Sequence, residues 1–204
     1  MRVFVVGTGR CGSVTFCKAC GHITNYTVDH ERVFTLRDKL DWPDQHIAVE
    51  PSMWPLVPLL RERYPELVLV HLVREDRAAF CASYRKLTSP PFIGAAAYRI
   101  PKEMRPPERA NWEGAPPTID VWSACCVGHP ANEEERLERI GLYYDTVNAT
   151  VAAMQPDVVV KLERPRIAWQ RFWATIGAEG DFVRSLGEWN TKHNSSQERE
   201  ATDE

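Results

Sequence analysis

A glycine-rich segment near the start of the chain has the residue types and spacing of a phosphate-binding turn. It reads Val5-Val-Gly-Thr-Gly-Arg-Cys-Gly-Ser-Val-Thr15 and follows a short apolar run. A buried strand that enters such a turn and then a helix aims backbone N–H groups and the positive end of the helix dipole at one point. Gly7 and Gly12 have the spacing of a nucleotide-triphosphate loop, but Ser13 stands where that motif needs lysine. The cation of this loop is instead Arg10. The alternative to a phosphate-binding loop is a tight turn that only joins a strand to a helix.

A second candidate phosphate contact follows the most apolar run of the chain. Residues 66–73 predict a strand that is apolar on both faces, and Arg74 comes directly after them. Ligands of open parallel sheets bind at the carboxyl ends of strands, and the planar guanidinium suits a phosphate. A helix is predicted for residues 76–87 directly after this strand.

The loop resembles the phosphosulfate-binding loop of sulfotransferases that use 3′-phosphoadenosine-5′-phosphosulfate as donor. That loop is usually written Pro, Lys or Arg, Ser, Gly, Thr or Ser, Thr. The resemblance implies that Arg10 withdraws charge from the bridging oxygen as sulfonate leaves. It also implies a cradle for the 5′-phosphosulfate made by Gly9, Arg10, Cys11, Gly12, Ser13 and Val14. Two hydroxyl groups of the family pattern are absent, because Cys11 replaces a common serine and Val14 a common threonine.

The segment from Val70 to Ser83 resembles the strand and helix that grip the 3′-phosphate in the same family. The resemblance implies that Arg74 and Ser83 make this contact. The alternative for Ser83 is a serine on the helix face that touches only its own backbone. The family serine usually lies one residue earlier, where this chain has Ala82, and one residue is about 100° of helix. The resemblance covers residues 1–87 and 133–177, where Glu163 occupies a position typical of the family, and it leaves the proline-rich middle unmatched.

Sulfonate transfer needs a group that takes the proton of the acceptor, usually a histidine or a carboxylate. Glu50 follows a predicted strand, so we expect it at the same sheet edge as the loop. The alternatives for Glu50 are a solvated turn residue and a salt-bridge partner of Arg10. His30, in the polar stretch after the first helix, is the reserve candidate. Weaker candidates are His71, which is expected in the core, His193 in the polar tail, and His22 and His129, which have no placed neighbour.

The elements that must position these residues alternate along the chain. Apolar runs predict strands at residues 2–6, 46–50, 66–73 and 157–162. Helices are predicted at 13–20, after Ser52 as N-cap, at 76–87, from 133 to 154, and at 167–176, which Gly177 closes. This alternation implies right-handed crossovers and an α/β fold with a central parallel sheet flanked by helices. The resemblance implies the P-loop-like sulfotransferase form of that fold.

Two regions set the expected domain organisation. Apolar residues at steps of three and four predict a core stripe on one long helix, made by Leu137, Ile140, Tyr144, Val147, Val151 and Met154. Seven of the 15 prolines lie between Pro90 and Pro117, which predicts a loop insertion over residues 88–120 that either contacts substrate or is a plain surface insertion. We expect one domain over residues 1–193 and a disordered polar tail over 194–204.

Composition narrows the class of protein. The 204 residues are 44% hydrophobic and 26% charged, as in globular proteins, and the formal net charge of −3 argues against binding of a long nucleic acid. No apolar run approaches the roughly 20 residues that span a bilayer. The first residues do not form a secretory signal, so we expect a cytoplasmic protein whose cysteines are mostly reduced.

The sequence thus predicts transfer of sulfonate to a hydroxyl or amine of a small-molecule, carbohydrate, lipid or peptide acceptor, with adenosine 3′,5′-bisphosphate as the product and no metal. The rivals are a P-loop nucleotide or small-molecule kinase and a non-catalytic partner-binding module on the same fold. A zinc site is disfavoured because one half of it has adjacent cysteines. Its ligands would be Cys17, Cys20, His22, Cys125, Cys126 and His129. The sequence identifies neither the acceptor nor the oligomeric state.

Overall fold

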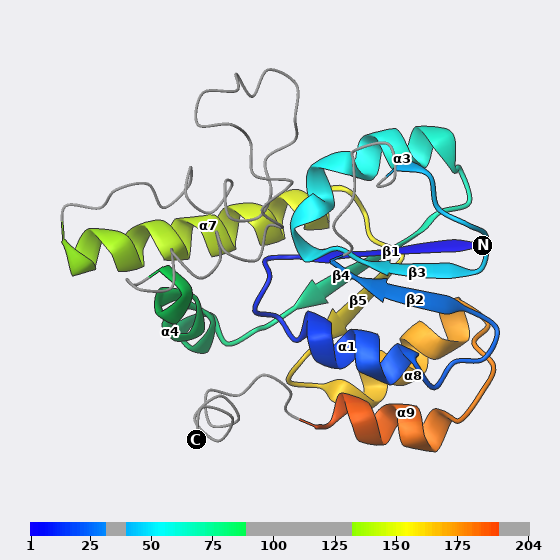
Figure 1. The fold of residues 1–204 in the computed structure, drawn as a ribbon. Helices are drawn as coiled ribbons and strands as arrows, with labels where there is room; N and C mark the ends of the chain where they lie inside the picture. The colour runs from blue at the N-terminus through cyan, green and yellow to red at the C-terminus, as the bar shows by residue number, and fades with distance from the viewer. Residues whose placement is uncertain (32–39, 89–131, 192–204) are drawn as a thin grey trace, which may run out of the picture. The chain divides into compact units, whose positions relative to one another are not determined.

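The computed structural model describes residues 1–31, 40–88 and 132–191 of the chain. The chain divides into two compact units, one made of Met1–Glu75 with Val147–Glu204 and the other of Asp76–Thr146. The first unit contains a five-stranded sheet (Figure 1). Of the insertion predicted over residues 88–120, Thr88 is the last residue of a helix, and the rest lies outside the described residues, as does the predicted polar tail over 194–204.

The sheet is parallel throughout, with the strand order β2-β3-β1-β4-β5. The strands are β1 (Arg2–Gly7), β2 (Thr27–His30), β3 (His46–Val49), β4 (Val68–Val73) and β5 (Val158–Lys161). The predicted α/β class with a central parallel sheet is therefore confirmed. Because all strands run the same way, their carboxyl ends meet at one edge, which brings every residue that follows a strand to that edge.

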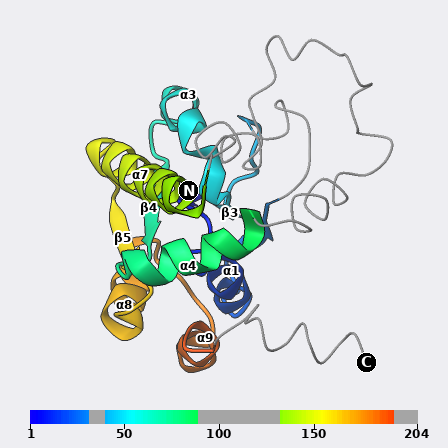
Figure 2. The same cartoon turned by 90° about the vertical axis from the view of Figure 1, so that its left-hand side faces the viewer.

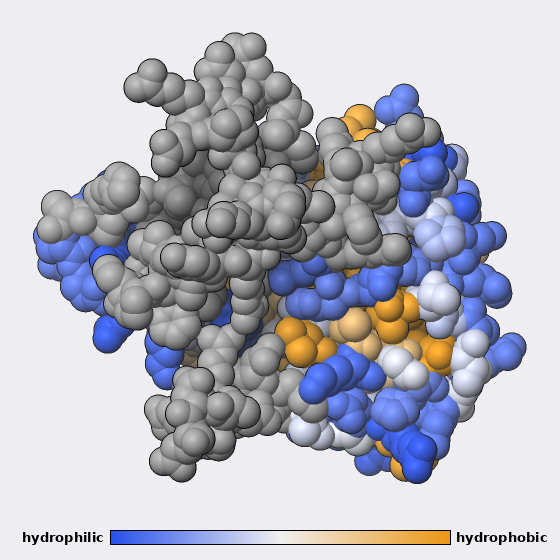
Figure 3. Space-filling view, viewed as in Figure 1, coloured by the Kyte–Doolittle hydropathy of each residue, from blue (hydrophilic) through white to orange (hydrophobic). Residues whose placement is uncertain are grey.

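Strand β2 is the one strand of the sheet that the sequence analysis missed. Its residues Thr27–His30 are exposed or half-buried, since β2 is an edge strand paired only with β3 in the described part of the chain. It contains Asp29 and His30 and therefore does not form an apolar run of the kind that predicted the other strands. Cys17, Tyr26 and Val28 are partly buried and pack against the core. Figure 3 shows apolar surface among polar residues on this side of the molecule.

Helices α1 (Ser13–Cys20), α8 (Pro165–Thr175) and α9 (Phe182–Trp189) cover one face of the sheet (Figures 1 and 2). Phe16 of α1 lies 5.2, 4.9 and 5.7 Å from the rings of Trp169, Phe172 and Trp189. Helix α9 was not predicted; Asp181 caps it by accepting a hydrogen bond from the Arg184 N–H. This aromatic cluster fixes α1, and with it the position of the glycine loop.

The other face is covered by the 3₁₀ helix η1 (Pro51–Leu56), by α3 (Val57–Arg63) and by the end of α7 (Glu133–Ala153). The predicted N-cap role of Ser52 is wrong: Ser52 lies inside η1, and the N-cap residues are Glu50 for η1 and Leu56 for α3. Pro55 and Pro58 lack the N–H groups that a continuous α-helix would need here, so the chain forms a 3₁₀ turn before α3. Arg61 of α3 donates to the carbonyl oxygen of Gln155 beyond α7.

The stripe predicted for α7 is confirmed in its middle. Ile140, Tyr144, Val147 and Val151 are all buried, whereas Leu137 is 37% exposed, so its prediction as a core residue is wrong. In the second unit, α4 (Arg77–Thr88) provides Phe80 and Tyr84, which pack with Tyr143 and Tyr144 of α7. These aromatic rings form the core of that unit.

Candidate functional site

The carboxyl edge of the sheet carries most of the residues that the sequence singled out. The connections that follow β1 and β3 leave toward opposite faces, through α1 and through η1. Open α/β sheets bind ligands at the carboxyl edge where adjacent strands change direction in this way. In sheet order, this edge presents His30, Glu50, the glycine loop and Arg74.

The glycine loop begins where β1 comes closest to β4. A Cβ atom on Gly7 would lie 2.3 Å from the Leu72 carbonyl oxygen, so this position accepts no side chain. Further along, Gly9, Arg10 and Gly12 have φ angles of 69°, 50° and 89°, the left-handed region that costs an arginine strain. The backbone therefore turns tightly three times between β1 and α1, as in the anion-binding concavities that successive N–H groups form.

The side chain of Cys11 lies on the inside of this loop. It is fully buried, and burial raises the pKa of its thiol to about 12, while backbone hydrogen bonds from Cys11, Gly9 and Thr8 lower it. The thiol is therefore protonated at neutral pH, and its side chain belongs to the hydrophobic core. Cys11 thus shapes the loop from within, and only its backbone is left for the cradle that the sequence predicted.

Helix α1 begins directly at the end of the loop. Gly12 is its N-cap residue and accepts the Phe16 N–H at 2.8 Å, which leaves the first amides of α1 directed at the carboxyl edge. The predicted cradle residue Val14 lies in this first turn and is half-buried. The loop and the helix start have the local geometry that favours an anion.

Ser13 and His30 meet at this edge, which the sequence analysis did not foresee. The Nε2 atom of His30 lies 2.9 Å from the Ser13 Oγ atom, and its Nδ1 atom lies 4.0 Å from a carboxylate oxygen of Glu31. His30 reaches the loop because it is the last residue of β2. Without β2 in the predicted fold, nothing in the sequence indicated this contact.

Glu50 follows β3 and is almost completely buried. Its side chain is 2% exposed, so the alternative of a solvated turn residue is wrong. Its backbone N–H donates to the Val5 carbonyl oxygen at 2.9 Å, which ties Glu50 to β1 just before the loop. Burial of a carboxylate costs free energy unless the group is paired, and buried carboxylates are common at functional sites.

Arg74 follows β4 and is half-buried. The next residue, Glu75, pairs through its carboxylate with Lys161 at the end of β5, at 2.6 Å. Ser83 is half-buried on α4 and belongs to the second unit, so its contact with the same phosphate as Arg74 stays a prediction. His71, which the sequence predicted to be a packed core residue, is 4% exposed and bonds to Asn148; its burial lowers its pKa.

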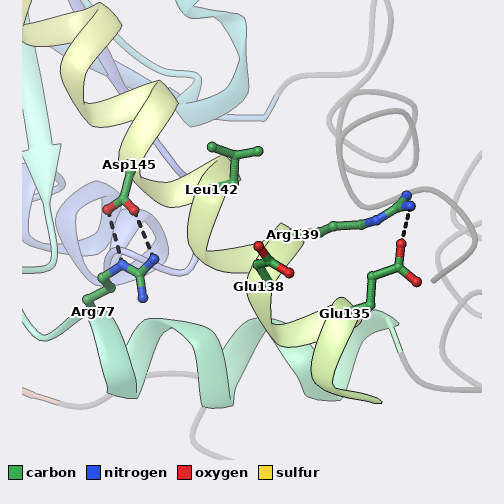
Figure 4. A pocket seen from close by; sticks show the side chains of 6 residues that line it. All are labelled: Arg77, Glu135, Glu138, Arg139, Leu142 and Asp145. Atoms are coloured by element: carbon green, nitrogen blue, oxygen red, sulfur yellow. Dashed lines mark hydrogen bonds and ion pairs between the residues drawn. The ribbon is translucent and has the colours of Figure 1, made fainter. Parts of the chain in front are cut away.

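The second unit contains a groove of about 400 Å³ between α4 and α7 (Figure 4). Its charged residues largely neutralise each other: Arg77 makes two hydrogen bonds to Asp145, and Arg139 pairs with Glu135. Gly141 makes room for this arrangement, because a Cβ atom there would lie 2.2 Å from the Arg77 guanidinium. The groove is thus explained by structural ion pairs.

Among the described residues, no three His, Cys, Asp or Glu side chains gather as a metal site requires. Cys17, Cys20 and His22 are described, but their proposed zinc partners Cys125, Cys126 and His129 lie outside the described residues. Within the same ranges, no helix is long and apolar enough to cross a membrane.

Comparisons with known proteins identify no relative of this chain. No family model matches the chain, and no curated protein or solved structure is significantly similar to it. The parallel α/β fold and the geometry of its carboxyl edge are therefore the basis for a functional proposal.

Proposed function

We propose that this chain is a sulfotransferase that uses 3′-phosphoadenosine-5′-phosphosulfate as donor and a hydroxyl or amine as acceptor. The observation that carries the proposal is the tightly turned glycine loop, with Arg10, that follows the central strand β1. The neighbouring strand β4 is followed directly by Arg74. The loop suits the 5′-phosphosulfate, and a guanidinium at the end of β4 suits the 3′-phosphate.

The chemistry assigns a task to each group at this edge. The acceptor oxygen or nitrogen forms a bond to sulfur while the bond from sulfur to the phosphate oxygen breaks, and adenosine 3′,5′-bisphosphate leaves. Arg10 and the loop amides stabilise the charge that develops on the leaving oxygen. Glu50 takes the acceptor proton, and His30 is the reserve base, now supported by its contact with Ser13.

Isothermal titration calorimetry with adenosine 3′,5′-bisphosphate tests the proposal before any acceptor is known. We expect saturable binding at micromolar to low millimolar ligand. No detectable binding at millimolar ligand would contradict the proposal. A thermal shift with ATP and Mg²⁺ that exceeds the shift with adenosine 3′,5′-bisphosphate would instead favour a kinase, which the absence of lysine at Ser13 disfavours.

The non-catalytic module remains as a second candidate because of Cys11. Its side chain is fully buried in the core, so this position of the loop offers no hydroxyl group to a phosphate. If the chain is such a module, neither adenosine 3′,5′-bisphosphate nor ATP should change the melting temperature of the protein. Binding of the bisphosphate separates the two candidates.

A further inference from the structure

Two hydrogen bonds from the end of β5 fasten the segment that carries Arg74. The Leu162 N–H donates to the Val73 carbonyl oxygen at 2.9 Å, immediately before Arg74. The Glu163 carboxylate accepts the Glu75 N–H, also at 2.9 Å, immediately after it. The backbone of Arg74 is therefore held on both sides by residues of one short segment.

The side chain of Glu75 reinforces this attachment. One carboxylate oxygen lies 2.6 Å from the Lys161 Nζ atom, and the other lies 3.5 Å from the Arg164 Nε atom. The hydrogen bond from Lys161 is the main reason that the pKa of Glu75 lies below its ordinary value. We call Glu75, Lys161, Glu163 and Arg164 the clasp. In the clasp, the Glu75 carboxylate pairs with two cations, Lys161 and Arg164.

We propose that Glu163 is a positioning residue that fixes Arg74 for recognition of a 3′-phosphate, an inference that rests on the proposed function. A residue just beyond a strand end has many backbone conformations, and each one moves its guanidinium by several ångströms. The bond from Glu75 N–H to Glu163 removes this freedom before the ligand binds, so less conformational entropy is lost on binding. Glu163 thus acts through the backbone of Glu75 and not on the phosphate itself.

Two substitutions of Glu163 separate positioning from charge. Glu163→Ala removes the acceptor of the Glu75 N–H, whereas Glu163→Gln keeps a carbonyl oxygen at the same reach and removes the charge. If Glu163 acts only by its charge, both variants bind anions more tightly. If it acts by position, Ala weakens binding and Gln restores it. Glu62→Ala, which removes an exposed carboxylate from α3, is the matched control.

The first readout needs no ligand. Amide hydrogen exchange of Glu75 should be about tenfold faster in Glu163→Ala than in the wild-type protein, and unchanged within about twofold in Glu163→Gln and Glu62→Ala, because exchange follows the opening of the bond. Equal exchange at Glu75 in the wild-type protein and Glu163→Ala would overturn the clasp itself.

The second readout is calorimetric titration with adenosine 3′,5′-bisphosphate and with adenosine 5′-monophosphate, which lacks the 3′-phosphate. We expect Glu163→Ala to lose about five- to tenfold affinity for the bisphosphate and less than about twofold for the monophosphate, with Glu163→Gln close to wild type. Equal losses for both ligands, or tighter binding by Glu163→Ala, would overturn the inference and leave the proposed function standing. A wild-type protein that binds neither ligand would overturn the proposed function as well.

Discussion

Two parts of the carboxyl edge, the glycine loop after β1 and the clasp between β4 and β5, are built in different ways. At the glycine loop, backbone geometry fixes the shape: Gly7 faces the Leu72 carbonyl oxygen, and three residues have left-handed φ angles. At the clasp, charged side chains fix the shape, and Glu75 and Lys161 are 35% and 38% exposed. Exposed ion pairs contribute little to the free energy of unfolding. A side chain forced against a backbone carbonyl, by contrast, lowers the free energy of unfolding strongly. We therefore expect changes in the loop to affect folding, and changes in the clasp to affect ligand affinity.

The largest effect should come from Gly7→Ala. The added Cβ atom would meet a backbone carbonyl that cannot move without separating β1 from β4, so the free energy of unfolding should fall by about 3 kcal/mol. Chemical denaturation followed by circular dichroism measures this change.

Gly187→Ala is the matched control for that experiment. Gly187 lies within α9 with no atom near its Cβ position, so alanine should raise the free energy of unfolding by about 0.5–1 kcal/mol. If Gly7→Ala were as stable as the wild-type protein, the loop would not depend on its backbone contact with β4.

The next effect concerns the two candidate bases beside the loop. Glu50→Gln keeps the shape of the side chain and removes its basicity, so turnover should fall about a hundredfold with affinity for adenosine 3′,5′-bisphosphate intact. The measurement is release of the bisphosphate from donor in the presence of an acceptor found by screening hydroxyl and amine compounds. His30→Gln is measured in parallel. Turnover of Glu50→Gln within a few-fold of wild type, together with a large loss in His30→Gln, would assign the proton transfer to His30.

The smallest effect should come from the clasp. Lys161→Met removes the hydrogen bond that lowers the pKa of Glu75, so this pKa should rise toward its ordinary value of 4.5. In the wild-type protein the folded pKa is below the unfolded one. The pair therefore stabilises the fold above about pH 4.5, and this contribution is lost as the pH falls through the lower, folded pKa. Nuclear magnetic resonance titration of the Glu75 carboxyl carbon measures the shift, and an unchanged pKa in Lys161→Met would show that the ion pair is not formed in solution.

The sequence predicted the central part of the edge well because the signals there are local. The strand, the closely spaced glycines and the start of the helix follow one another within a few residues, so each supports the prediction of the next. Arg74 was found in the same way, because it directly follows an apolar strand. Elements without apolar runs were missed for the same reason. The edge strand β2 carries Asp29 and His30, and α9 is specified by its cap and by tertiary contacts with α1 and α8.

Contacts between distant segments were beyond prediction from a single sequence. The bond from Ser13 to His30 depends on β2 lying beside β3, and the clasp joins Glu75 to residues more than 80 positions away. Neither pairing follows from residue type or spacing. The burial of Glu50 was equally hidden, because a glutamate before a proline normally indicates a solvated turn.

The central claim is that the end of β4 recognises a 3′-phosphate, and the most direct test combines two ligands with one substitution. Adenosine 3′,5′-bisphosphate and adenosine 5′-monophosphate are titrated into the wild-type protein, into Arg74→Ala and into Arg166→Ala, which removes an exposed arginine from α8 as a charge control. A charge-assisted contact is worth about 1.5–3 kcal/mol, so Arg74→Ala should reduce the preference for the bisphosphate by about tenfold or more, and Arg166→Ala should leave it unchanged. Equal losses of both ligands in Arg74→Ala would contradict the account and assign Arg74 to the scaffold.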